Sequence, residues 1–133
     1  ADLRPFKQRG GKLLMYHGWS DPAISAYGTV NYYDQVKSIV GGQDAMDSFA
    51  KLYLVPGMHH CTGGPGPNDF DVLPALENWV EKGQSPGPIV ASHKTSGVVD
   101  RTRPLCPHPQ VATYKGSGDI NDAANFTCAV PSR

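Results

Sequence analysis

The chain has 133 residues, and its 12 basic and 12 acidic side chains give a formal net charge of zero. This length fits one domain, the balanced charge argues against a nucleic-acid partner, and no apolar run approaches the roughly 20 residues of a membrane span. The 15 glycines and 12 prolines form no repeat, which favours a compact core with long irregular segments.

Four regular elements are predicted in the first part of the chain. The apolar patterns indicate a strand at 12–17, a helix at 25–40, a strand at 49–55 and a helix at 69–82. Each is followed by turn-forming residues: Gly18, Gly41-Gly42, Pro56-Gly57 and Gly83. This strand–helix–strand–helix order predicts the α/β class, with a parallel sheet and crossover helices. Two strands leave sheet edges uncovered, so we expect a further half to pack against them.

The remainder of the chain reads as a tail. From Ser85 onward it is rich in Pro and Gly, with weak strand signals only near 89–92 and 111–114. We expect residues 85–133 to be an extended, irregular tail that packs on the domain formed by residues 1–84. Cys106 and Cys128 lie in this tail and are predicted to form a disulfide. Cys61 is then left over, and in an oxidising compartment its partner would lie in a segment outside this chain.

Two residues that follow the predicted strands could carry chemistry. Asp21 and His60 both lie just beyond the carboxyl end of a strand, where functional loops of parallel sheets gather. A carboxylate bonded to one imidazole nitrogen would leave the other nitrogen free to take a proton from a serine. Acid before base is also the chain order of α/β-hydrolases. The spacing alone leaves simpler interpretations open, a turn-forming Asp before Pro22 and a loop histidine.

The same segments resemble the tannase and feruloyl esterase family. The resemblance extends from about Gly11 to Pro131 and rests on these stretches: Gly18-Trp19-Ser20-Asp21-Pro22, Ile24-Ser25, Tyr32-Tyr33, Val55-Pro56-Gly57-Met58-His59-His60-Cys61, Gly63-Gly64, residues 101–107 and residues 114–121. It implies the C-terminal part of an α/β-hydrolase fold that acts on esters of aromatic acids, such as gallate, ferulate or terephthalate monoesters.

The resemblance also implies roles for individual residues. Asp21 matches the acid and His60 the base of a Ser-His-Asp triad. Cys61 matches a cysteine bonded to the one just before the nucleophilic serine, and Cys106 with Cys128 matches a second disulfide. Ile24 falls where the family places a side chain near the acyl pocket, which makes it a candidate substrate-binding residue. No serine elbow occurs in these 133 residues, and the lid domain with its calcium site is expected elsewhere, so we expect no cofactor or metal site in this chain.

The sequence therefore predicts one segment of a secreted serine carboxylesterase, extracellular or periplasmic, with any export signal upstream of Ala1. Its partners would be the N-terminal half and lid of the parent enzyme and an aromatic ester substrate, and the chain alone is expected to be inactive. The alternative is a truncated, non-catalytic hydrolase module that serves as a binding domain. Two other hypotheses are disfavoured because adjacent side chains in a loop diverge: metal ligation by residues 59–61, and a nucleophilic Cys61 beside its own base.

Overall fold

The computed structural model describes residues 1–132. In chain order the elements are α1 (Arg4–Gln8), β1 (Leu13–Gly18), α2 (Ala26–Val40), α3 (Gln43–Asp47), β2 (Ala50–Val55), α4 (Leu73–Lys82), β3 (Ile89–Thr95), β4 (Val98–Leu105), β5 (Val111–Tyr114), the 3-10 turn η1 (Ala123–Asn125) and β6 (Phe126–Ala129). Within these residues, no helix is both long and apolar enough to cross a membrane.

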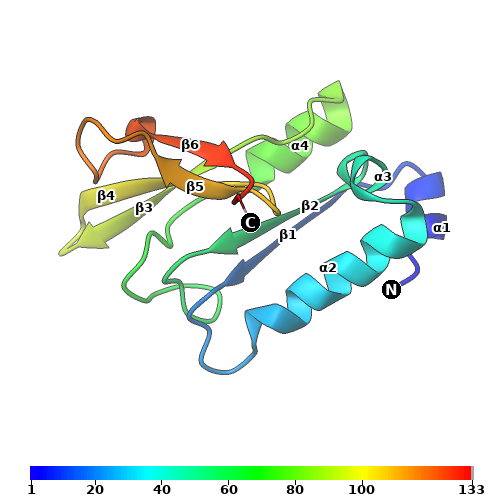
Figure 1. The fold of residues 1–133 in the computed structure, drawn as a ribbon, viewed down its shortest axis with the longest axis horizontal. Coiled ribbons are helices and arrows are strands. Elements are labelled where there is room, and N and C mark those ends of the chain that lie inside the picture. Colours follow the sequence, from blue (N-terminus) through cyan, green and yellow to red (C-terminus); the bar gives the residue numbers. More distant parts are fainter. Residues whose placement is uncertain (133) are drawn as a thin grey trace.

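Strands β1 and β2 form a parallel pair that positions the later site. Their register runs from Leu13 opposite Ala50 to Gly18 opposite Val55, so both strands end at the same edge. The long helix α2 makes the crossover between them and lies beside β1 (Figure 1). The helix ends at Gly41, whose left-handed backbone closes the last turn by donating its N–H to the Lys37 carbonyl. The loops that follow β1 and β2 are thereby brought to one edge of the sheet.

Strand β2 contributes to two apolar clusters, and this links the two parts of the chain. Leu52 belongs to a cluster with residues of α2 and α3, such as Tyr33 and Met46. Tyr53 belongs to a second cluster, which includes residues of β3 and β4. Burial raises the pKa of the Tyr53 phenol to about 12, and its hydroxyl donates to the Gly87 carbonyl at 2.8 Å. The later segment is therefore packed on the α/β part through a shared core.

The expectation of an irregular tail is corrected by four strands. Strands β3 and β4 form an antiparallel hairpin, and β5 pairs antiparallel with β6 (Figure 1). The hairpin turn has positive φ at both Ser96 and Gly97, as a tight turn between right-twisted strands requires. The Ser-Gly dipeptide was the available signal. It was obscured because half of β4, from Asp100 to Arg103, is charged or polar.

The disulfide expected in this segment is present. Cys106 follows β4 and Cys128 lies in β6, with a Cα–Cα distance of 5.6 Å. The bond therefore connects the end of the first hairpin to the second. Cys106 is itself buried, so the bond is part of the packing between the two hairpins.

Helix α4 begins at Leu73, four residues later than the sequence suggested. Asp69 is held in an extended conformation because its backbone exchanges hydrogen bonds with Ser92 of β3, at 3.0 and 2.9 Å. The Asp71 side chain then accepts the Leu73 N–H at 2.9 Å, and a proline occupies the first turn. Trp79 is 3% exposed and anchors the helix. Tertiary pairing therefore overrides the helical pattern at 69–72.

Candidate active site

Asp21 is held rigidly in the loop that follows β1. One carboxylate oxygen accepts backbone N–H bonds from Ala23 at 2.8 Å and from Ile24 at 2.9 Å, and the side chain is only 3% exposed. The Ile24 N–H is the main cause that lowers the pKa of Asp21 well below its ordinary value. Burial opposes this shift, and the bonds from His60 and Ala23 reinforce it. Asp21 is therefore a carboxylate that stays ionised.

His60 bonds to the second oxygen of that carboxylate. Its Nδ1 lies 2.7 Å from Asp21 Oδ2, while the His60 side chain remains 53% exposed. Because an ionised carboxylate can only accept, Nδ1 carries the shared proton, and the neutral ring keeps its lone pair on Nε2. The arrangement presents an oriented, accessible proton acceptor, which is what general-base chemistry requires.

The two loops meet because Gly18 has no side chain. A Cβ atom at this position would overlap the carbonyl oxygens of Met58 and His59. The contact is reinforced by two backbone hydrogen bonds, from the Trp19 N–H to the Val55 carbonyl at 2.9 Å and from the Ser20 N–H to the Met58 carbonyl at 3.0 Å. Met58 is fully buried and anchors the second loop. The loops that follow β1 and β2 are thus held together directly beside the Asp21–His60 pair.

His17 also contacts Asp21, and sequence reasoning had given it no role. Its Nδ1 lies 2.7 Å from the Thr29 hydroxyl, and its Nε2 lies 3.0 Å from the Ile24 carbonyl and 3.4 Å from Asp21 Oδ2. The His17 ring therefore connects α2 with the loop that follows β1 and with the Asp21 carboxylate. The only sequence signal was its position at the end of a strand before Gly18.

Ile24 lies beside Asp21 but lines a different hollow from the Asp21–His60 pair. Ile24 is 57% exposed and lines a hollow of about 420 Å³. Asp21 and His60 line a separate hollow of about 170 Å³. Tyr16 is a lining residue of both hollows. The substrate-binding role of Ile24 stays a prediction.

Cys61 lies at the rim of the hollow that holds His60. It is exposed and has no disulfide partner in the described chain, and its φ of 64° is unusual for a residue with a side chain. Its link to a segment outside this chain stays a prediction. Among residues 1–132, no three His, Cys, Asp or Glu side chains are grouped so that they could hold a metal ion.

Parallel strands, a crossover helix and a carboxylate–imidazole pair beyond the strand ends are typical of an α/β-type hydrolase. A family model described as tannase and feruloyl esterase matches residues 1–129. The chain belongs to the tannase and feruloyl esterase family.

Named relatives and solved structures agree with this membership. The chain is 53% identical over 134 residues to a mono(2-hydroxyethyl) terephthalate hydrolase from Piscinibacter sakaiensis, covering 98% of this chain and 22% of that protein. It is 40% identical to a probable feruloyl esterase from Arthroderma benhamiae, covering 96% of this chain and 24% of that protein. The crystal structure of feruloyl esterase B from Aspergillus oryzae superposes with a TM-score of 0.89 at 30% identity, over 96% of this chain and 28% of that one. The chain thus spans about a quarter of the length of these relatives.

Proposed function

We propose that this chain supplies the acid and the base of a serine carboxylic ester hydrolase that acts on esters of aromatic acids. The observation that carries the proposal is the 2.7 Å bond between a buried Asp21 carboxylate and an exposed His60 ring. The names of the relatives support the substrate class, since they include a terephthalate monoester hydrolase, a feruloyl esterase and a tannase.

In the proposed reaction, His60 Nε2 takes the proton from a serine hydroxyl while the serine oxygen bonds to the ester carbonyl carbon. Asp21 keeps Nδ1 protonated and stabilises the imidazolium that forms. As the tetrahedral intermediate collapses, the bond to the leaving alkoxide breaks, and His60 returns the proton to it as an alcohol. Water then repeats the sequence on the acyl-serine, releasing the aromatic acid and the free serine.

The serine belongs, in this proposal, to another segment of a longer esterase. That segment, together with a calcium-binding lid, would complete the oxyanion donors and the substrate pocket. Cys61, exposed beside His60, would form a disulfide with the cysteine next to the serine and so tether base to nucleophile. Ile24 would face the acyl group through the adjoining hollow. The Cys106–Cys128 bond supports export to an extracellular or periplasmic space, where disulfides persist.

The test compares variants of the longer esterase that contains this chain. His60→Ala should lower kcat on an aromatic ester by a factor on the order of 10³ or more, and Asp21→Asn by a factor of a similar order. His93→Ala is a matched control, because its Nδ1 also bonds a carboxylate, that of Asp100 at 2.6 Å, within the β3–β4 hairpin and away from the Asp21–His60 pair. The control should keep nearly full activity.

Two outcomes would contradict the proposal. One is a His60→Ala enzyme that is as active as His93→Ala. The other is ester turnover by the purified 133-residue chain that survives a serine-directed inhibitor, since the proposal places the nucleophile elsewhere. A longer protein without any serine elbow would instead favour a non-catalytic binding module.

A further inference from the structure

We infer that a second pocket of this chain binds a small aromatic carboxylate. The pocket, here called the arginine pocket, has a volume of about 400 Å³ and lies between the 56–67 loop and β4. Its size is within the range of small-molecule sites. None of its lining residues also lines the Asp21–His60 hollow, so it is a separate site. The residues that carry the argument are Pro65, Arg101, Arg103, Leu105, Ala112 and Phe126.

Arg101 brings an incompletely satisfied guanidinium to this pocket. Its Nη2 donates to the Pro65 carbonyl at 2.6 Å, which fixes the side chain against the loop. Its Nε is buried and has no hydrogen-bond partner among the described residues. A buried donor of a charged group that lacks an acceptor is costly. This Nε has almost no accessible surface, so a ligand in the pocket would reach the guanidinium through its terminal nitrogens.

Arg103 adds a second cation with no carboxylate partner. Its guanidinium carbon lies 4.2 Å from the centre of the Phe126 ring, and its Nη1 donates to the Thr102 carbonyl at 2.7 Å. Burial lowers the pKa of Arg103, and the neighbouring Arg101 lowers it further. Among the ion pairs of residues 1–132, none includes either arginine.

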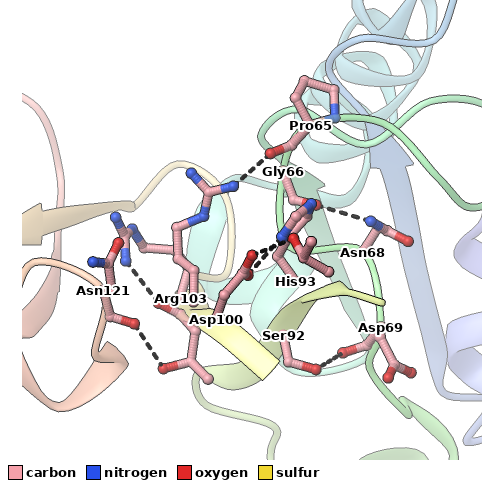
Figure 2. Close-up of polar contacts among 12 residues, drawn as sticks. Pro65, Gly66, Asn68, Asp69, Ser92, His93, Asp100, Arg103 and Asn121 are labelled. Atoms are coloured by element: carbon pink, nitrogen blue, oxygen red, sulfur yellow. Dashed lines mark hydrogen bonds and ion pairs between the residues drawn. The ribbon is translucent and has the colours of Figure 1, made fainter. Parts of the chain in front are cut away.

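No acidic side chain of the described residues neutralises the pair. None of the pocket-lining residues is Asp or Glu. Asp100, which precedes Arg101, is engaged by His93 at 2.6 Å and by the Thr95 hydroxyl at 2.5 Å. Figure 2 shows Asp100 turned towards His93, and the Pro65 carbonyl facing the guanidinium that bonds it. Asp119 favours the charged form of Arg103 but forms no ion pair with it. Two adjacent, partly desolvated cations therefore face the pocket without a counterion.

The ligand class follows from these two features together. Guanidinium groups present planar forks of N–H donors that match a carboxylate. The rest of the wall is mainly apolar and includes Leu105, Ala112 and Phe126, which suits a ring rather than a hydrated inorganic anion. A carboxylate attached directly to an aromatic ring satisfies both. The inference does not depend on ester hydrolysis, because binding can be measured on this chain alone.

The test is an NMR titration of the ¹⁵N-labelled chain with benzoate, benzamide and acetate. We expect saturable shifts of the Ala112 and Phe126 amides with benzoate, and binding at least tenfold weaker for benzamide, which has no charge. Acetate, which imitates an Asp or Glu side chain, should also bind at least tenfold more weakly. Arg103→Gln should weaken benzoate binding at least tenfold, as should Arg101→Gln if its spectrum shows an intact fold. Arg9→Gln removes the same charge from an exposed site and should change nothing.

Equal binding of benzamide and benzoate would overturn the inference, since the arginines would then contribute nothing. Equal binding of acetate would overturn the aromatic ligand, because the ring would then add nothing to the affinity. An absence of saturable benzoate shifts in the unmodified chain would overturn the site itself. This last measurement does not depend on any variant folding correctly.

Discussion

Replacing Gly18 by Ala tests whether the contact between the two loops creates the acid–base pair. The added Cβ would overlap two backbone carbonyl oxygens, those of Met58 and His59, and backbone cannot rotate away as a flexible side chain would. Restoring ordinary contact distances requires the loops to separate by on the order of 1 Å. Overpacking of this kind costs about 1–3 kcal/mol. A misplacement of about 1 Å at a reacting group can cost roughly 100-fold in rate.

The assay has two readouts and a matched control. In the 133-residue chain, Gly18→Ala should lower the melting temperature by on the order of 5–10 °C. In a longer esterase that contains the chain, it should lower kcat by about 100-fold. Gly28→Ala is the control for the stability readout, because Gly28 lies inside α2 and a Cβ there would meet no atom within 4 Å. It should stabilise the helix by about 0.5–1 kcal/mol. The reasoning is refuted if Gly18→Ala keeps full activity and the stability of the unmodified chain.

Three further predictions concern the disulfide, Asp21 and His17. The double variant Cys106→Ser, Cys128→Ser opens a loop of sequence separation 22. It should lower the free energy of unfolding, measured in urea, by about 3 kcal/mol. A loss below about 1 kcal/mol would contradict this. Because its pKa lies below the ordinary 3.8, ionised Asp21 stabilises the fold above about pH 3.8, and this contribution disappears as the pH falls through the lowered pKa. The difference in unfolding free energy between the unmodified chain and Asp21→Asn should therefore shrink below about pH 4, and a constant difference down to about pH 2 would exclude the assigned shift. In the longer esterase, His17→Gln should lower kcat roughly tenfold with KM unchanged, because it positions Asp21 without touching substrate; a pure rise in KM would show another role.

The sequence predicted that Asp21 and His60 lie close together, and the 2.7 Å contact between them agrees with this, whereas their roles as acid and base come from the family resemblance and stay a proposal. Asp21 and His60 each follow an apolar run that is too short for a helix, and parallel strands bring their carboxyl ends together. The contribution of His17 could not be predicted in this way. Whether its ring turns back to the carboxylate depends on Thr29 in α2, twelve residues away, and no periodic pattern encodes that contact.

The weak strand signals near 89–92 and 111–114 coincide with β3 and β5, but β4 and β6 were missed for a different reason. Strand signals depend on alternating apolar residues, whereas β4 contains Asp100, Arg101 and Arg103 and is stabilised by pairing with β3. The arginine pocket could not be predicted from the sequence for the same reason. Charged residues in a Pro-rich stretch are typical of a solvent-exposed loop. The two cations of the pocket share a face of β4 because they are two positions apart, and Phe126 of the second hairpin lies against Arg103.

The most direct test of the acid–base assignment is the tautomer of His60, measured by long-range ¹H–¹⁵N NMR on this chain at about pH 8. With Asp21 accepting from Nδ1 at 2.7 Å, Nδ1 should carry the proton and Nε2 should show the shift of a bare, unprotonated nitrogen. Asp21→Asn should abolish this preference, while His93 should be unaffected. A neutral His60 ring protonated on Nε2 would contradict the Asp21–His60 hydrogen bond on which the proposed function rests. So would a His60 tautomer that is the same in Asp21→Asn as in the unmodified chain.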